Sequence, residues 1–367
     1  MKPIKSIQFQ VEKNKFINHA IEEITEENLT LATDEIIVKV DLFSFTSNNI
    51  TYAVSGEIIR YWEFFPPVGK QTEGWGVIPV WGFADVVESK ADNIPVGDRI
   101  FGYFPPASHL KMKAGHITGK RFIDVSEHRS TLPPTYNLYR RVLSEPNYDQ
   151  KLDRDRALFY PLYITSFCLW DSLQENNWFG AEQTIILSAS SKTSIGLAYG
   201  LHIDETAPNA IGITSERNLE AVVKLGLYDE VYTYDQLAQI NSTIPTVIVD
   251  MSGNNVVLVD LHKRLGDLMK FTFKVGLTHW KESNPNEGII RERSKFFFAP
   301  SHIQKRIEDW GASEFDQKTG QFLVDAVATT KAWLQYKNLD GLAELATVYP
   351  TVCNGTLAAD QGLIVKM

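Results

Sequence analysis

The chain has 367 residues, of which 44% are hydrophobic and 22% are charged, and its 36 Lys and Arg against 45 Asp and Glu give a formal net charge of −9. This length predicts two domains, and the composition is that of a folded, mildly acidic protein rather than a disordered or collagen-like one. The basic residues are dispersed along the chain, which argues against a nucleic-acid partner.

Cysteine usage and hydropathy favour a cytoplasmic protein. The chain has 2 cysteines, Cys168 and Cys353, too few for a disulfide framework or a four-thiolate zinc site. The N-terminal segment has no apolar signal-like stretch, and no segment reaches the roughly 18 apolar residues that a membrane span needs. We therefore expect a reducing compartment and no membrane partner.

The first 150 residues have the pattern of a β-rich domain. Short apolar segments at 4–11, 35–43, 77–88 and 99–104 predict strands, and turn sequences rich in Pro, Gly and Asn separate them. Such a series of short strands predicts a β-barrel-like domain over residues 1–150.

Beyond residue 150, strands and helices alternate. A long apolar segment at 157–177 predicts a buried helix. It is followed by predicted strands at 184–189, 210–214, 230–233, 246–250 and 268–276, and by predicted helices at 194–202, 216–225 and 256–265. Because strands joined through helices pair in parallel, residues 151–300 are predicted to form a doubly wound α/β domain.

The C-terminal part is predicted to rejoin the first domain. Two helices are expected at 303–310 and 322–337, and two short strands at 346–352 and 363–365. We expect residues 301–367 to complete the domain formed by the first 150 residues.

Several motifs, in the same order along the chain, resemble the zinc-free, quinone-oxidoreductase-like side of the medium-chain dehydrogenase/reductase superfamily. The most specific is Pro-Val-Gly-Asp-Arg-Ile-Phe-Gly at 95–102, which is similar to the family's VGDRVFG. The other resembling segments lie at 35–40 (EIIVKV), 43–56, 82–89, 163–167, 225–234 and 249–253.

This resemblance implies a GroES-like partial β-barrel followed by a Rossmann domain, with the active site in the cleft between them, and a homodimer. It also implies a reductase that uses NAD(P)H on a small-molecule substrate such as a quinone, enone or carbonyl. Zinc is not expected, because Pro79-Val-Trp81 stands where zinc-binding members carry Gly-His-Glu, and residues 43–49 contain no cysteine.

The phosphate-binding turn departs most from the resembled family. A Rossmann turn uses glycines for its bend and for close approach of the pyrophosphate. Here the segment 187–196 reads Leu-Ser-Ala-Ser-Ser-Lys-Thr-Ser-Ile-Gly. The hydroxyls of Ser190, Ser191 and Thr193, with the cation Lys192, can bind phosphate by hydrogen bonds and charge. The alternative is that the hydroxyls only cap the helix.

The end of the second Rossmann strand favours NADPH over NADH. Thr214, Ser215 and Arg217 match the small polar and basic residues that accommodate a 2′-phosphate. Tyr234 matches a tyrosine of the resembled family and is expected near the same adenosine. Glu216 is a counter-signal, since its charge would repel the phosphate.

The candidate catalytic residues come from the segment that resembles the substrate loop of the zinc-free relatives. Asn48 and Asn49 can donate hydrogen bonds to a substrate carbonyl or a ribose, and Tyr52 can donate a proton. The alternative is a turn with Tyr52 in the core. Gly276 follows the last Rossmann strand, where the family's backbone meets the nicotinamide, and His279 is a further candidate.

Three interpretations of function therefore remain open. The first is a zinc-independent, NADPH-dependent oxidoreductase. The second is a non-catalytic ligand-binding or regulatory protein of the same fold, which loss of the glycine-rich turn favours. The third is an enzyme of different chemistry that uses the cleft without nicotinamide. A polar aromatic segment with Tyr136, Asn137 and Tyr139 either lines that cleft or seals the hinge.

Overall fold

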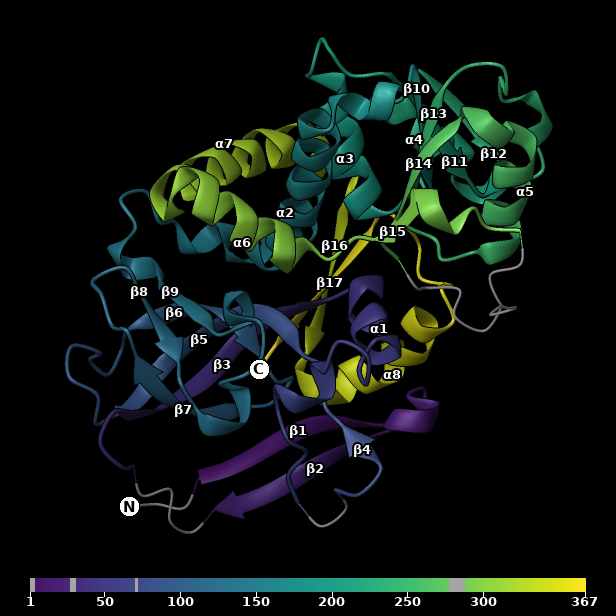
Figure 1. Ribbon diagram of the computed structural model, residues 1–367. Coiled ribbons are helices and arrows are strands. Elements are labelled where there is room, and N and C mark those ends of the chain that lie inside the picture. The colour runs from purple at the N-terminus through teal and green to yellow at the C-terminus, as the bar shows by residue number, and fades with distance from the viewer. Residues whose placement is uncertain (1–3, 27–30, 70–71, 277–287) are drawn as a thin grey trace. The chain divides into compact units, whose positions relative to one another are not determined.

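The computed structural model describes residues 4–26, 31–69, 72–276 and 288–367 (Figure 1). The chain divides into two compact units: Met1–Leu158 with Gln335–Met367 form the first, and Phe159–Leu334 form the second. None of the helices within these described ranges is long and apolar enough to cross a membrane.

A closed barrel forms the centre of the first unit. Its strands belong to one sheet of order β16-β17-β3-β5-β6-β9-β8-β7, and β3 also pairs with β7 and so closes the barrel. The barrel strands are β3 (Glu35–Phe45), β5 (Val80–Ser89), β6 (Arg99–Phe104), β7 (His109–Gly115), β8 (Arg121–Asp124) and β9 (Leu138–Arg141). The predicted β-barrel-like domain is thereby confirmed.

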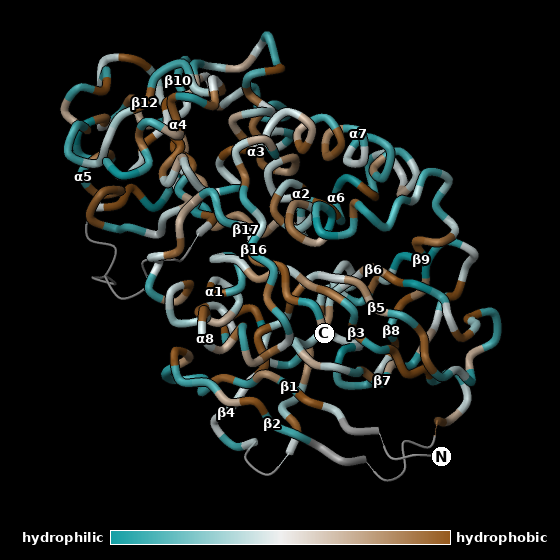
Figure 2. Tube along the Cα trace, turned by 180° about the vertical axis from the view of Figure 1, so that it is seen from behind, coloured by the Kyte–Doolittle hydropathy of each residue, from teal (hydrophilic) through white to brown (hydrophobic). Residues whose placement is uncertain are grey.

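Apolar strands pack the inside of this barrel. All six residues of β6 are buried, and β3 and β5 contribute Phe43 and Phe83, both fully buried. These apolar stretches can be followed in the hydropathy colouring of Figure 2. A second, small sheet of order β2-β1-β4 and the helix α1 (Ser47–Val54) complete this part of the unit; the strands are β1 (Ile4–Glu12), β2 (His19–Glu26) and β4 (Trp75–Gly76).

The C-terminal segment adds two strands and a helix to the first unit. Strand β17 (Gln361–Lys366) pairs antiparallel with β3, and β16 (Gln335–Asp340) pairs in parallel with β17. The strand predicted at 346–352 is wrong: α8 (Gly341–Cys353) occupies this segment. Its buried residues Leu342, Leu345, Tyr349 and Val352 recur with helical spacing, which outweighs the β-branched residues that suggested a strand.

The second unit contains a six-stranded parallel sheet of order β12-β11-β10-β13-β14-β15. This is the 3-2-1-4-5-6 order of a doubly wound dinucleotide-binding domain, so the predicted fold is confirmed. The strands are β10 (Gln183–Leu187), β11 (Asn209–Thr214), β12 (Glu230–Thr233), β13 (Thr246–Asp250), β14 (Met269–Lys274) and β15 (Ser294–Phe296).

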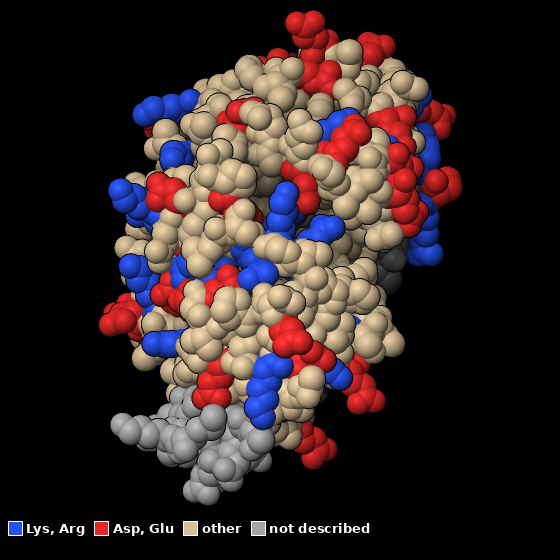
Figure 3. All heavy atoms as spheres, turned by 90° about the vertical axis from the view of Figure 1, so that its left-hand side faces the viewer, with Lys and Arg blue, Asp and Glu red and all other residues tan. Residues whose placement is uncertain are grey.

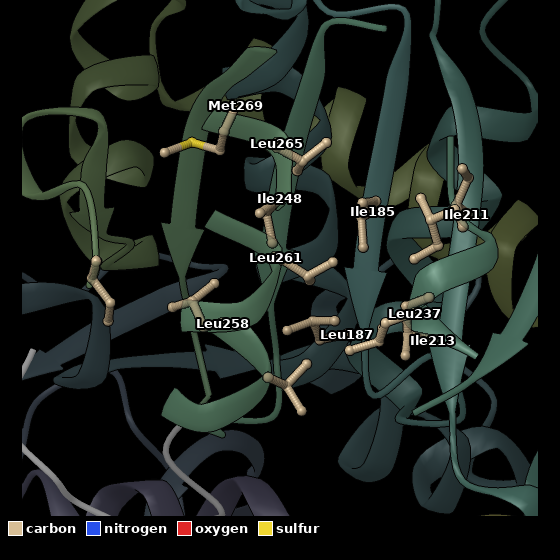
Figure 4. Packing of buried hydrophobic residues seen from close by; sticks show 13 residues of the cluster. Ile185, Leu187, Ile211, Ile213, Leu237, Ile248, Leu258, Leu261, Leu265 and Met269 are labelled. Atoms are coloured by element: carbon tan, nitrogen blue, oxygen red, sulfur yellow. The ribbon is translucent and has the colours of Figure 1, made fainter. Parts of the chain in front are cut away.

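Helices cover this sheet and bury its apolar side chains. Figure 4 shows Leu258, Leu261 and Leu265 of one helix directed toward Ile248 and Leu187 of the sheet. That helix is α5 (Asn255–Leu265), and the other connecting helices are α3 (Lys192–His202) and α4 (Leu219–Leu225). The long helix α2 (Asp153–Glu175) precedes β10.

Helices α6 (Ala299–Trp310) and α7 (Ala312–Thr330) lie in the second unit, whereas the sequence suggested that everything after residue 300 joins the first. Phe322 of α7 packs against Phe167 and Trp170 of α2, with ring centroids 5.5 and 5.9 Å apart. The chain therefore returns to the first unit only at Gln335.

One face of the molecule carries side chains of both charges. On the face shown in Figure 3, acidic and basic side chains stand next to each other over much of the area. That face therefore carries no field of a single sign.

Candidate functional site

The strand order of the second unit identifies where a ligand would bind. From β10 the chain continues to β11 and β12 on one side of the sheet, and to β13 and β14 on the other. In open parallel sheets, ligands bind outside the carboxyl ends of the strands at the point where the order reverses. Here this point lies between the ends of β10 and β13.

The turn after β10 keeps the backbone shape of a glycine turn although it contains no glycine. Ser188, directly after β10, has φ of 60°, in the left-handed region that favours glycine. Further along, Gly196 remains, and a Cβ there would lie 2.6 Å from Ser166 Oγ and 2.8 Å from a ring atom of Tyr163. The close packing of α3 on α2 therefore still depends on a glycine.

Two of the predicted phosphate-binding hydroxyls have partners within the protein. Ser191 precedes α3, and its Oγ accepts from Ser194 N (3.2 Å) and donates to Ser194 Oγ (2.8 Å). The Oγ of Ser190 accepts a hydrogen bond from Asn218 Nδ2 (3.0 Å). Ser191 thus acts as the helix cap that the sequence left as an alternative.

Lys192 and Thr193 form the first turn of α3. Lys192 is partly buried, and its Nζ lies 5.7 Å from the centroid of the Trp333 indole ring. The backbone carbonyl of Thr193 accepts a hydrogen bond from Ser166 Oγ (2.7 Å). The cation of the turn is therefore held beside the helix N-terminus, where the backbone N–H groups and the helix dipole favour an anion.

The hydroxyl groups of two tyrosines form hydrogen bonds with the backbone of this turn. The hydroxyl of Tyr228 donates to the carbonyl of Ala189 (2.8 Å), and the hydroxyl of Tyr234 accepts from the N–H of Ser188 (3.1 Å). The backbone N–H of Tyr234 donates to the carbonyl of Thr214 (3.2 Å). Tyr234 thus joins the end of β11 to the phosphate-binding turn, and burial raises its pKa to about 12.

The residues after β11 differ in exposure. The side chain of Thr214 is 1% exposed, and its Oγ1 has no hydrogen-bond partner within the part of the chain that the structure describes. Ser215 is partly buried, while Glu216 and Arg217 are exposed in a short 3₁₀ helix. The structure therefore brings together Thr214, Tyr234 and the turn, and leaves Arg217 at the surface of the same edge.

Asp250, which the sequence did not single out, ends β13 at the same edge. One oxygen of its carboxyl group, Oδ1, accepts three hydrogen bonds, while the other is buried without a partner among the described residues. The sequence does carry a signal for Asp250: it is a carboxylate at the end of an apolar strand, and parallel sheets bind ligands at this edge.

Gly276 lies beyond β14, and its N–H donates to the carbonyl of Asp250 (3.1 Å). A Cβ on Gly276 would lie 1.9 Å from the carbonyl oxygen of Met251, so no other residue fits at this close approach of two backbones. His279 lies outside the described residues.

The predicted catalytic residues form a separate group in the first unit, on α1. Asn49 is 4% exposed; its Oδ1 accepts from the N–H of Thr46 (2.7 Å), and its Nδ2 donates to the carbonyl of Pro79 (2.8 Å). Together with Thr46 it forms a capping box at the start of α1. The side chain of Asn49 thus holds the helix in place.

Tyr52 and Asn48 lie next to this cap. Tyr52 is 6% exposed, and burial raises its pKa to about 12, whereas the polar groups of Trp81 and Asn48 act in the opposite direction. Its ring packs on those of Tyr61 and Tyr103, with centroids 4.6 and 5.7 Å apart. Tyr52 is therefore a buried phenol with polar neighbours, protonated at neutral pH.

The polar aromatic segment before α2 is buried in the first unit. Tyr136, Asn137 and Tyr139 are 7%, 4% and 0% exposed. The buried guanidinium of Arg129 donates to Asn137 Oδ1 and Tyr139 Oη, both at 2.9 Å, and to the carbonyl of Tyr136. These residues support the barrel around Arg129.

No group of three or more His, Cys, Asp and Glu side chains within the described ranges is arranged to hold a metal ion.

A family profile described as "Protein of unknown function (DUF2855)" matches residues 43–358. Among curated proteins, none matches the sequence.

Solved structures match over nearly the whole length of both chains. A mutant form of enoyl thioester reductase from Candida tropicalis is 13% identical with a TM-score of 0.55, covering 99% of this chain and 100% of that chain. A putative NADPH:quinone reductase from Bacillus thuringiensis is 11% identical with a TM-score of 0.58, covering 99% of both. CurA from Vibrio vulnificus, in complex with NADPH, is 13% identical with a TM-score of 0.59, covering 98% of this chain and 99% of that chain. The fold is that of the medium-chain dehydrogenase/reductases.

Proposed function

The chain belongs to the family described as "Protein of unknown function (DUF2855)", and from this premise we propose that it is a zinc-independent reductase that uses NADPH to reduce a small quinone, enone or carbonyl compound. The observation that carries the proposal is the cation of Lys192 beside a turn that keeps glycine geometry at the switch point of the sheet. The matching structures include one in complex with NADPH, which supports the same ligand.

Four features of the turn support a bound dinucleotide. Ser188 adopts the left-handed conformation, and Gly196 still permits close packing of α3 on α2. Lys192 supplies a positive charge to a pyrophosphate at the N-terminus of α3. The hydroxyl of Thr193 is a further donor, while Ser190 and Ser191 hold the turn through Asn218 and Ser194.

The adenosine half of the ligand is proposed to lie along the ends of β11 and β12. Thr214 offers a buried hydroxyl without a protein partner in the described chain, and Ser215 follows it. Arg217 is proposed to pair with the 2′-phosphate, and this pairing is the proposed basis of a preference for NADPH. Tyr234 borders the same region. Gly276, which packs against the backbone of Met251, is proposed to lie beside the nicotinamide half.

Bound NADPH supplies a hydride, and the protein has to supply a hydrogen bond to the developing enolate or alkoxide and then a proton. Tyr52 is the proposed proton donor, because a phenol is protonated at neutral pH and can transfer its proton to a developing alkoxide or enolate. Asn48 is proposed to position that phenol or the substrate carbonyl. Asn49 acts indirectly, since its side chain is engaged by Thr46 and Pro79.

A second candidate function is a non-catalytic ligand-binding or regulatory protein of the same fold. Specific contacts favour it: Tyr234 is bonded to the N–H of Ser188, and the hydroxyl of Ser191 caps α3. Under this alternative, the hydroxyl-rich turn is a structural replacement for the glycines, and neither nicotinamide nucleotide binds.

Calorimetric titration of the full-length protein with NADPH and, separately, with NADH distinguishes the two functions. We expect micromolar affinity for NADPH and weaker binding of NADH. Lys192→Ala should weaken NADPH binding by about 1–3 kcal/mol, because a charge-assisted contact is lost. Lys224→Ala is the matched control, since Lys224 is an exposed lysine in the last turn of α4. No binding of either nucleotide at millimolar concentration would rule out the reductase.

A further inference from the structure

The carboxyl group of Asp250 is held rigidly by one of its two oxygens. Asp250 Oδ1 accepts hydrogen bonds from Ser252 N (2.8 Å), Ser252 Oγ (2.7 Å) and Gly253 N (3.0 Å). Three donors on one oxygen fix the plane of the carboxyl group and therefore the position of the other oxygen, Oδ2.

Asp250 Oδ2 is buried and has no hydrogen-bond partner within the described part of the chain, and the whole side chain is 0% exposed. A buried acceptor without a partner lowers stability, so its presence at this edge of the sheet needs a physical explanation. The protein thus fixes the orientation of the carboxyl group, but the described residues form hydrogen bonds with only one of its two oxygens.

The neighbours of Asp250 lie at the switch point of the sheet. Asp250 ends β13 beside β10 and pairs in register with Lys274 of β14. Its charge raises the pKa of Tyr234 in addition to the larger effect of burial, so these two side chains lie near each other. Tyr234 in turn accepts from the N–H of Ser188 in the turn. Asp250 therefore belongs to the same group of residues as the phosphate-binding turn.

The backbone around Asp250 is also built for close approach. The N–H groups of Val275 and Gly276 both donate to its carbonyl, at 2.8 and 3.1 Å, and Gly276 leaves no room for a side chain next to Met251. Gly276 therefore adds no side chain at the end of β13.

We propose that Asp250 is a binding residue for the dinucleotide, whose ribose hydroxyl or carboxamide N–H donates a hydrogen bond to Oδ2. This inference rests on the proposed function, since it assigns a residue of the same site. This hydrogen bond also explains why the protein keeps Oδ2 in a fixed position although no described residue donates to it.

The test combines calorimetric titration with NADPH and thermal unfolding, on the wild type and on Asp250→Asn. The amide oxygen can take the place of Oδ1, while an N–H group replaces the free acceptor. We expect NADPH affinity to fall about tenfold or more. The melting temperature without NADPH should stay within about 3 °C of the wild type, and NADPH should raise it less than in the wild type.

Thr184→Val is the matched control, because Thr184 Oγ1 is another buried, unpartnered oxygen, near the opposite end of the same sheet in β10. This variant should bind NADPH with wild-type affinity. If Asp250→Asn does not yield folded protein, Ser252→Ala tests the same point: it removes one donor that orients the carboxyl group and should weaken NADPH binding about threefold.

The outcomes separate the two proposals. If the wild type binds NADPH and Asp250→Asn binds it equally well, the inference is overturned and the proposed function stands. A lower melting temperature with unchanged affinity has the same meaning, because it assigns Asp250 a purely structural role. If the wild type binds no NADPH, both proposals fail together.

Discussion

The hydroxyl of Tyr234 accepts a hydrogen bond from the N–H of Ser188 across 3.1 Å, so a tyrosine side chain occupies a backbone donor of the turn that is proposed to bind phosphate. A phosphate that uses this donor has to displace the hydroxyl. Tyr234→Phe removes the competing group and keeps the ring, so NADPH should bind about two- to fivefold more tightly, as measured by calorimetric titration.

Tyr232→Phe is the control for this variant, because Tyr232 lies on β12, two residues before Tyr234, and its hydroxyl donates to Glu230. It should leave NADPH affinity unchanged. Weaker binding by Tyr234→Phe would mean instead that the Tyr234 hydroxyl itself contacts the ligand.

Gly276 should be among the least replaceable residues of the second unit. A Cβ at this position would lie 1.9 Å from the carbonyl oxygen of Met251, a backbone atom that cannot rotate away. Gly276→Ala should therefore lower the free energy of unfolding by on the order of 3 kcal/mol, measured by chemical denaturation.

Gly320→Ala is the opposite case. Gly320 lies inside α7, and a Cβ there would meet no atom within 4 Å. This variant should raise the free energy of unfolding by about 0.5–1 kcal/mol, since alanine favours the helix. If both variants change stability equally, the steric explanation for Gly276 is wrong.

The fold was largely predictable because the apolar residues of most strands and helices recur with the spacing typical of that element. The strands predicted at 230–233 and 246–250 coincide with β12 and β13, since short runs of strand-forming residues bounded by turn residues leave little freedom. The tail was harder to predict. In α8, Pro350 and β-branched residues conceal the helical spacing of Leu342 and Tyr349, and only packing in the first unit decides the helix.

The candidate site was predictable in position but not in detail. A run of hydroxylated residues after an apolar strand located the turn. The sequence left open whether Ser191 caps α3, and it did not indicate that Ser188 adopts a positive φ. Asn49 resembles a catalytic amide until its contacts with Thr46 and Pro79 are known. Such roles depend on partners distant in sequence or on backbone conformation.

Arg217 should determine the preference for NADPH over NADH. It is exposed after β11, where a 2′-phosphate is proposed to bind. Arg217→Ala should weaken NADPH binding about tenfold and leave NADH binding unchanged, because NADH lacks the phosphate. Glu216→Gln should act in the opposite direction by removing a repulsive charge. Equal losses for both nucleotides would place Arg217 elsewhere in the site.

His262 of α5 should make the protein less stable in mild acid. The N–H of Ile290 donates to its Nδ1 (3.0 Å), so the proton lies on Nε2, which donates to Thr272 Oγ1 (3.0 Å). Burial, together with the charges of Arg293 and Lys274, lowers the pKa of His262 to about 4. The unfolded chain, with the ordinary value of about 6.5, therefore binds this proton more readily than the folded protein.

The stabilisation from neutral His262 is complete above about pH 6.5 and is lost as the pH falls from there toward 4, because protonation then favours the unfolded chain. His262→Asn keeps an acceptor for Ile290 but does not titrate. Its melting temperature at pH 7 should be lower than that of the wild type, and its further decrease between pH 6.5 and 4 should be smaller. Parallel curves for the two proteins in this window would show that His262 does not cause the acid sensitivity.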